Sequence, residues 1–191
     1  MIWFNRTQPK ISLPPASAKA RVRARAEKRL LRQLERQNRR RDAQVSACQT
    51  QMQQPEHVLE VDCLQSWFWT EAGILKAVDG VSFSISKGQT VCLAGESGCG
   101  KSVLGLSLMR LLPRPQGQIV GGAIRLDTGA YVCDIVRAPE RTLEQIRGNA
   151  MSLIVQEPAT SLNPVLRVGE QILEPIRLHQ PELTPAEGKA R

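Results

Sequence analysis

The sequence has few aromatic residues, few histidines and no long apolar run. It contains three Trp, three Phe, one Tyr and two His among 191 residues. Because no stretch of 18 or more apolar residues occurs, a membrane-spanning helix is not expected, and the first residues do not follow the signal-peptide pattern. The five cysteines form no C-x-x-C pair, which argues against zinc and disulfide frameworks and favours reduced thiols in a cytosolic protein.

Acidic residues are scarce in the first part of the chain. Residues 1–56 hold 13 Lys and Arg against 4 Asp and Glu, whereas residues 57–191 hold 13 against 14. The net charge of +8 therefore comes from the first 56 residues, which are called the leader below. The whole chain is long enough for a single medium-sized domain with its own core.

The leader is expected to be helical or disordered. Residues 16–54 contain neither Gly nor Pro, and Val22, Ala26, Leu30 and Leu34 recur every four residues in a narrow apolar stripe. The many arginines suggest attraction to anionic lipid or to nucleic acid. A solvated helix without a specific partner is the simpler interpretation.

One segment matches the G-x-x-x-x-G-K-[ST] pattern of a phosphate-binding loop. Its residues, called the phosphate loop below, are Gly95, Glu96, Ser97, Gly98, Cys99, Gly100, Lys101 and Ser102. The glycines allow backbone N–H groups to face phosphate oxygens, which a side chain would obstruct. The Lys101 ammonium can reach the terminal phosphates, and the Ser102 hydroxyl can bind the accompanying magnesium ion. We therefore expect this loop to bind a nucleoside triphosphate.

The flanking residues predict the strand, loop and helix order that this motif requires. Residues 90–94 form a short apolar run and are expected to be a buried parallel strand. Residues 102–112 are apolar enough for a packed helix that Pro113 ends. The phosphates would then lie at the positive end of the helix.

Two further segments, residues 59–83 and 151–176, distinguish between the classes of phosphate-loop protein. Together with the loop they resemble the ATP-binding subunits of ABC transporters, in particular the importers of peptides, nickel and glutathione. Residues 156–164 (QEPATSLNP) are characteristic of the peptide-importer subgroup, and residues 168–180 look closest to glutathione importers. The resemblance covers residues 57–191, so a start of translation near its beginning is a further hypothesis.

The resemblance implies roles for two more residues. Phe68 aligns with an aromatic that stacks on adenine in the family, and Gln156 aligns with the glutamine that meets magnesium and the attacking water. Each residue also has a purely structural interpretation. Phe68 can pack in the core of a small sheet, and Gln156 can be a polar residue that ends a buried strand.

Local patterns predict the elements that follow the loop. Residues 118–127 suggest a strand with a glycine pair at a bend. Residues 139–147 suggest a short helix that Gly148 ends. Residues 151–155 are expected to be a buried strand, and residues 168–179 an amphipathic helix.

The resemblance implies an α/β fold, with a P-loop NTPase core of the ABC type and an antiparallel β subdomain, preceded by the leader. Residues 57–191 would be the N-terminal part of the ATP-binding domain, with its helical subdomain beginning near residue 165. The family's signature sequence, its strand-ending aspartate with the catalytic glutamate, and its switch histidine follow the Q-loop glutamine, and we find none of them in this sequence. We therefore expect a fold that is incomplete at its C-terminus, with an exposed sheet edge, and slow ATP hydrolysis by the chain alone.

The expected function is that of an ATP-binding subunit, or a fragment of one, which energises an importer of peptides or glutathione-like substrates. ATP and Mg²⁺ are the implied cofactors. The implied partners are membrane permease subunits, a second ATP-binding domain and, indirectly, a substrate-binding protein, at the cytoplasmic face of the cell membrane. The alternatives are a non-catalytic nucleotide-binding remnant and, more weakly, a nucleic-acid-associating protein that acts through the leader.

Overall fold

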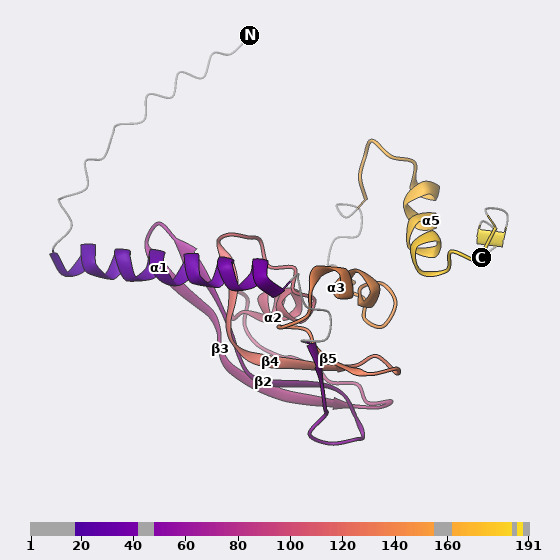
Figure 1. The fold of residues 1–191 in the computed structure, drawn as a ribbon, viewed down its shortest axis with the longest axis horizontal. Helices are drawn as coiled ribbons and strands as arrows, with labels where there is room; N and C mark the ends of the chain where they lie inside the picture. The colour runs from indigo at the N-terminus through magenta and orange to yellow at the C-terminus, as the bar shows by residue number, and fades with distance from the viewer. Residues whose placement is uncertain (1–17, 42–47, 155–161, 185–186, 189–191) are drawn as a thin grey trace, which may run out of the picture.

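The chain forms a mixed arrangement of helices and antiparallel strands (Figure 1). The structure is a computed structural model that describes residues 18–41, 48–154, 162–184 and 187–188. In chain order the elements are α1 (Ala18–Arg41), β1 (Gln49–Thr50), β2 (His57–Thr70), β3 (Gly73–Ser86), α2 (Lys101–Leu108), β4 (Gly117–Asp127), β5 (Val132–Asp134), α3 (Glu140–Ile146) and α5 (Val168–His179). No helix among the described residues is long and apolar enough to cross a membrane.

An antiparallel sheet of five strands, in the order β1-β5-β4-β2-β3, is the framework of the fold. β2 and β3 are rich in β-branched and aromatic residues, which fit a pleated surface. They form a long hairpin in which Thr70 pairs with Gly73 at the tip. β4 pairs with the other side of β2. The antiparallel part that the sequence predicts is therefore present.

The glycine pair in β4 marks a bend, as the sequence predicts. Gly122 has a φ of +88°, and a Cβ there would lie 2.6 Å from the carbonyl oxygens of Asp62 and Cys63. On the facing strand Cys63 itself has a φ of +45°, and the β2–β4 register shifts between Asp62 and Gln65. Glycine is required at position 122 because β2 bulges towards it at this point.

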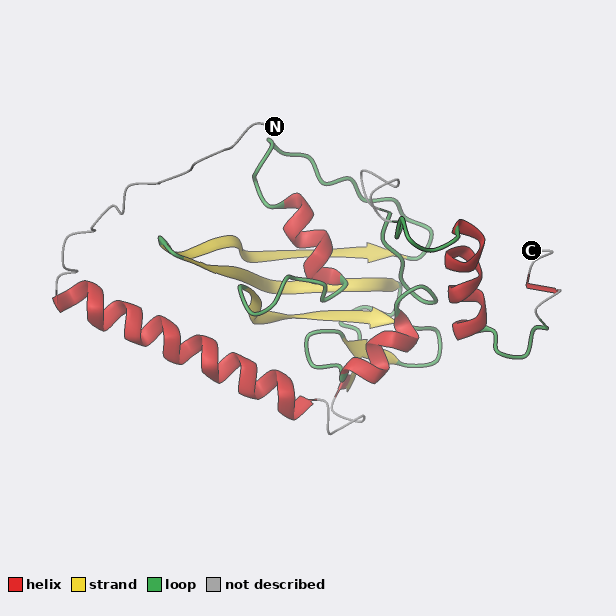
Figure 2. Ribbon diagram, turned by 90° about the horizontal axis from the view of Figure 1, so that it is seen from above, coloured by secondary structure: helices red, strands yellow, loops and turns green. Residues whose placement is uncertain are grey.

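The core lies between one face of the sheet and the helices α2 and α3 (Figures 1 and 2). Its fully buried side chains include Leu64 of β2, Ile124 of β4 and Leu143 of α3. Burying one such side chain contributes about 1.5–3 kcal/mol. A hydrogen bond of 2.8 Å between the buried hydroxyls of Ser66 and Ser107 ties α2 to β2, so the helix that follows the phosphate loop is anchored on the sheet.

The last residues of the leader take part in the sheet. β1 pairs with β5, with Gln49 opposite Cys133, and Cys48 is buried in the same core. Burial and the neighbouring thiol of Cys48 raise the pKa of Cys133 well above its ordinary range. The assignment of residues 1–56 to a separate leader stays a prediction, but this structure builds residues 48–56 into the domain.

Glu60 attaches the end of the leader to β2. Its side chain is only 5% exposed; it accepts hydrogen bonds from the N–H groups of Gln53 and Gln54 and lies 2.9 Å from Nδ1 of His57. Arg125 lies 3.6 Å from the same carboxylate. Burial by itself would raise the pKa of Glu60, but these hydrogen bonds outweigh it and hold the pKa below its ordinary value of 4.5. The buried carboxylate is therefore charged at neutral pH.

α1 runs along the β4 side of the sheet (Figures 1 and 2). β5 pairs with β4 only at residues 125–127, so the preceding edge of β4 has no strand partner among the described residues. Asn38 Nδ2 donates a hydrogen bond of 2.9 Å to Oε1 of Gln118, and Nε1 of Trp69 donates one of 3.2 Å to the carbonyl oxygen of Glu27. A helix beside a strand edge limits pairing of that edge with other chains.

Two predicted strands are absent. Residues 90–94 form no strand, and the side chains of Val91 and Leu93 are 37% and 45% exposed. Residues 151–154 contain only an isolated bridge, and the side chain of Ile154 is 94% exposed; the last residue predicted for this strand lies outside the described part. A parallel strand needs a neighbouring strand for its hydrogen bonds, and no described strand lies beside either run.

The two helices predicted after β5 are confirmed. α3 follows Pro139, and Gly148, with a φ of +82°, comes two residues after its end. α5 spans the predicted residues, but none of its side chains is buried. In Figure 1 it stands apart from the sheet at one end of the molecule.

We predict that Glu60→Gln lowers the free energy of unfolding by about 1–3 kcal/mol at neutral pH, because an amide cannot accept every hydrogen bond that the carboxylate accepts. Since folding lowers the pKa of Glu60, its stabilisation is present above pH 4.5 and is lost as the pH falls below that value. Thermal unfolding, followed by circular dichroism at neutral and acid pH, measures both effects.

The matched control is Glu71→Gln at the exposed end of the hairpin, which should leave the melting temperature unchanged. A melting temperature of Glu60→Gln equal to that of the wild type at neutral pH would contradict the role of Glu60.

Candidate functional site

The phosphate loop precedes α2 and turns at two glycines. Gly98 and Gly100 have φ values of +82° and +99°, which side chains rarely tolerate. Gly100 is the residue before the first turn of α2, and its carbonyl oxygen accepts the N–H of Leu104 at 2.8 Å. The loop and the following helix are therefore present in the predicted order, with the helix beginning at Lys101 rather than Ser102.

The loop touches the sheet at Gly100. A Cβ at this position would overlap the carbonyl oxygen of Ala77 in β3. The β2–β3 register shifts between Ser66 and Trp67, which leaves Ala77 without an opposite residue on β2. This bulge lets the loop backbone approach the strand closely, and bulges of this kind are common beside functional sites.

The side chain of Lys101 lies across the loop. Its ammonium donates hydrogen bonds of 2.6 Å to the carbonyl oxygens of Gly95 and Glu96 and lies 3.4 Å from Sγ of Cys99. A Cβ at Gly95 would lie 2.7 Å from the same sulfur. The N–H groups of the ammonium are thus directed at groups of the loop itself, which keeps the charge beside the loop backbone.

α2 ends at Leu108, earlier than the predicted end at Leu112. Arg110 has a φ of +52°, and the N–H groups of residues 110 and 111 donate to the carbonyl oxygens of Ser107 and Leu106 at 2.9 and 2.8 Å. This is the hydrogen-bond pattern with which a left-handed glycine commonly ends a helix. The position of Pro113 therefore does not decide where the helix ends.

The side chain of Arg110 holds this unfavourable backbone conformation in place. Its guanidinium donates hydrogen bonds to the carbonyl oxygens of Ile135 and Ala138 and pairs with Glu140 at 3.2 Å. Burial by itself would raise the pKa of Glu140, but the hydrogen bond from Arg147 and the charges of Arg147 and Arg110 hold it below its ordinary value. α2 is therefore fixed at both ends, by Gly100 at its start and by Arg110 at its end.

An open cavity of about 420 Å³ lies between the phosphate loop and the β2–β3 hairpin. The hairpin contributes Phe68, Leu75 and Ala77 to its lining. The loop and α2 contribute Ser97, Gly98, Gly100, Lys101, Ser102 and Val103. The structure thus brings Phe68 and the phosphate loop, separated by about 30 residues of sequence, to one cavity with an apolar wall and a cationic wall.

The ring of Phe68 also packs against β4. A Cβ at Gly117 would lie 3.0 Å from the ring of Phe68, so the glycine leaves room for the aromatic side chain. Phe68 pairs with Leu75 on β3 and with Gly117 on β4. The half-buried ring is supported on the sheet while it lines the cavity.

The described residues offer few ligands for a metal ion. Ser102 is exposed in the first turn of α2, but none of the described Asp or Glu residues lines the cavity. In the part of the chain that the structure describes, no group of three or more His, Cys, Asp or Glu side chains could hold a metal. Gln156, the second predicted magnesium ligand, lies outside the described residues.

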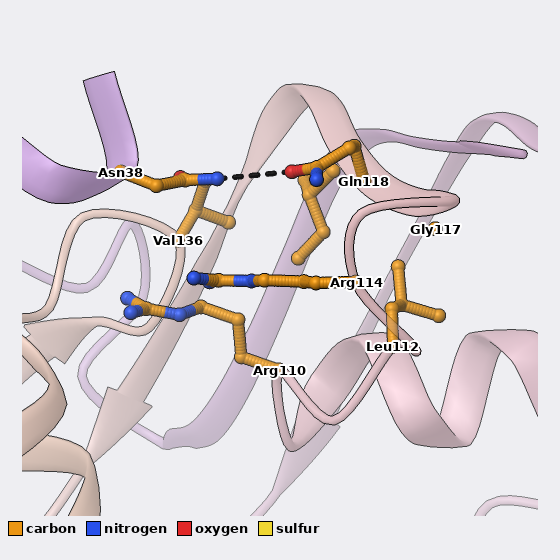
Figure 3. Close-up of a pocket in the computed structure, with 8 residues that line it drawn as sticks. Asn38, Arg110, Leu112, Arg114, Gly117, Gln118 and Val136 are labelled. Carbon is orange, nitrogen blue, oxygen red and sulfur yellow. Dashed lines mark hydrogen bonds between the residues drawn. The ribbon is translucent and has the colours of Figure 1, made fainter. Parts of the chain in front are cut away.

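A second pocket lies beyond the end of α2 (Figure 3). Figure 3 shows the side chains of Arg110 and Arg114 running side by side below the hydrogen bond between Asn38 and Gln118. Its volume is about 10 Å³, which is room for about one water molecule. It is too small for a nucleotide.

Sequence reasoning did not identify Leu75, Ala77, Val103 or Gly117 as parts of the site. The signal that could have found Leu75 is the hairpin register, because Leu75 is the cross-strand partner of Phe68. The bulge at Ala77 and the close approach of Gly117 depend on contacts between strands and leave no local pattern in the sequence.

A comparison with protein families bears directly on this arrangement. The family model described as ABC transporter matches residues 78–189, which is more than half of the chain. The chain belongs to the ABC transporter family. The resemblance that the loop and its neighbouring segments indicate is therefore confirmed, as is the P-loop ATPase fold with mixed helices and strands.

Curated members of the ABC transporter family align with the chain over about 125 residues. The oligopeptide transport ATP-binding protein AppD of Bacillus subtilis is 47% identical over 64% of this chain and 36% of its own length. The glutathione import ATP-binding protein GsiA of Pectobacterium atrosepticum is 43% identical over 65% of this chain and 20% of its own length. The dipeptide transport ATP-binding protein DppD of Bacillus subtilis is 42% identical over 65% of this chain and 36% of its own length. The matched part of this chain thus spans about a third or less of these relatives.

We predict that Gly100→Ala displaces the phosphate loop from β3, because the new methyl group would overlap the carbonyl oxygen of Ala77. The overlap and the left-handed backbone together should lower the free energy of unfolding by about 1–3 kcal/mol or more. Chemical denaturation followed by tryptophan fluorescence measures the change.

Gly88→Ala separates the two causes. Its φ of +74° carries the same backbone cost, but no atom lies within 4 Å of the added Cβ. If both variants lost the same stability, the contact between loop and strand would have no energetic role.

Proposed function

We propose that the chain binds ATP in the cavity between the phosphate loop and the β2–β3 hairpin. The observation that carries the proposal is the difference between the two walls of this cavity, with the aromatic Phe68 on the hairpin side and Lys101 with the glycine loop on the other. ATP has the matching polarity, because a flat base stands at one end and an anionic triphosphate at the other. A volume of about 420 Å³ lies within the usual range for sites of small molecules.

Each part of the lining has a role in the proposed complex. The ring of Phe68 stacks on the base, supported from behind by Gly117. The backbone N–H groups of the phosphate loop and the start of α2 face the phosphates. Phosphate oxygens replace the carbonyl oxygens of Gly95 and Glu96 as acceptors for the Lys101 ammonium.

Mg²⁺ fits this site through Ser102. A hydroxyl beside the phosphates suits an ion that keeps most of its water and takes few protein ligands. The ion would neutralise part of the phosphate charge. Gln156 is proposed as a further ligand on the resemblance alone. Because no carboxylate lines the cavity, the described residues supply no base for the attacking water, and we expect hydrolysis by the chain alone to be slow.

The wider function follows from the family and from the relatives. We propose that the chain acts as an ATP-binding subunit, or part of one, of an importer at the cytoplasmic face of the cell membrane. Permease subunits, a second ATP-binding domain and a substrate-binding protein would be its partners. The names of the relatives support peptides or glutathione as the substrate class, and the identities do not separate these substrates.

We predict that Lys101→Ala weakens the binding of Mg²⁺–ATP at least about tenfold, because it removes the cation of the cavity. Titration calorimetry measures the affinity. Lys87→Ala, an exposed lysine of the same charge away from the cavity, should bind as the wild type does. If Lys101→Ala bound Mg²⁺–ATP as tightly as the wild type, the assignment of the loop as the phosphate site would be wrong.

A second prediction tests the other end of the cavity. Phe68→Ala should weaken the binding of ATP by about 1–3 kcal/mol, which is the usual effect of removing an aromatic side chain that stacks on a base. The same variant should leave the affinity for tripolyphosphate unchanged, because this ligand has no base. Phe68→Tyr keeps the ring and should retain ATP affinity. Equal losses for both ligands in Phe68→Ala would mean that the ring supports the fold and does not bind adenine.

A further inference from the structure

The exposed face of α1 is positively charged. Its described side chains include six exposed basic residues: Arg23, Arg25, Lys28, Arg29, Arg32 and Arg36. Arg23 pairs with Glu27 at 3.0 Å, whereas no ion pair joins the other five to any described residue. Their spacing of three or four residues places these five on one side of the helix. They are called the basic stripe below.

The opposite side of α1 faces the domain. Leu34 is buried, and Leu30 and Leu31 are partly buried. Glu27 and Glu35, the two acidic residues of the helix, are partly buried as well. At 100° per residue the three leucines and Glu27 lie on the other side of the helix from the basic stripe, whereas Glu35 lies at the margin of the stripe, three residues after Arg32. The helix therefore places its leucines and Glu27 towards the protein and the cations of the basic stripe towards solvent.

The basic stripe is accessible. It runs from Arg25 to Arg36, which is roughly 17 Å along the helix. In Figure 2 α1 runs along the outer margin of the molecule, and no other described helix or strand lies beyond it. The hydrogen bonds that Asn38 and Trp69 make across the interface attach the helix to the sheet, so a surface that binds the stripe would also orient the domain.

We propose that the basic stripe docks on the anionic lipid headgroups of a membrane surface. The proposal rests on the proposed function in one respect, namely that the chain works at a membrane. Arginine forms paired hydrogen bonds with phosphate groups, and clusters of basic residues bind anionic bilayers electrostatically. Because the leucines face the domain, the helix lies on the headgroups and does not insert an apolar face into the bilayer. Nucleic acid, which also presents phosphates, is the competing partner.

The test uses the full chain and vesicles of phosphatidylglycerol and phosphatidylcholine, with vesicles of phosphatidylcholine alone for comparison. We expect the chain to sediment with the anionic vesicles only and to be released by high salt, which screens such contacts. The triple variant Arg25→Gln, Arg29→Gln, Arg32→Gln should bind the anionic vesicles at least about tenfold more weakly.

The matched control is Arg141→Gln, Arg167→Gln, Arg177→Gln, which removes the same charge from exposed positions outside α1. It should retain vesicle binding. Equal losses in the two triple variants would show a dependence on net charge alone and overturn the proposal. Sedimentation with uncharged vesicles, or complete release from anionic vesicles by an equal phosphate concentration of duplex DNA, would also overturn it.

Calorimetry with Mg²⁺–ATP keeps this proposal separate from the nucleotide site. The triple variant in α1 should bind ATP as the wild type does, because the basic stripe does not line the cavity. Lys101→Ala should still sediment with anionic vesicles. If the wild-type chain sedimented with anionic vesicles but bound no Mg²⁺–ATP, the proposed nucleotide site would be wrong and the membrane docking would stand.

Discussion

The contact between Gly100 and the carbonyl of Ala77 is the constraint on which the site depends. It sets the start of α2 against the bulge of β3, and the buried hydrogen bond between Ser66 and Ser107 keeps the helix there. Once the helix start is fixed, Lys101 and the loop face the same cavity as Phe68. A side chain at position 100 would move the loop away from the hairpin and separate the two walls of the cavity.

Local signals in the sequence predicted the elements that depend on local chemistry. Gly98 and Gly100 of the loop, Gly122 at the bend and Gly148 after α3 are positions where the backbone has a positive φ. The strand predicted at 90–94, and the described residues 151–154 of the strand predicted at 151–155, are absent for the opposite reason. A strand exists only beside another strand, and an apolar run of residues carries no information about whether its neighbour is in place. The same limit applies to the end of α2, because the contacts of the Arg110 side chain, which lie far along the chain, determine where the helix ends.

The candidate site was predictable in part. The eight residues of the phosphate loop follow from the motif alone, whereas Phe68 was assigned only through a family resemblance and Gln156 stays a prediction. The structure makes the core role and the proposed binding role of Phe68 compatible, because the ring packs beside Gly117 and the side chain also lines the cavity. Leu75 and Ala77 could not be assigned without the register of the hairpin, which a single sequence does not specify.

The fold divides the five cysteines into two chemically different groups. Cys48 and Cys133 are buried together, and their environment keeps the Cys133 thiol protonated. Cys99 is one of three exposed cysteines and lies inside the phosphate loop beside the Lys101 ammonium. Because Cys99 is exposed, an alkylating reagent can reach it without entering the core. The thiolate is the form of cysteine that reacts. Protection of Cys99 from alkylation would therefore report occupancy of the loop in the unmodified protein, with the two other exposed thiols as an internal reference.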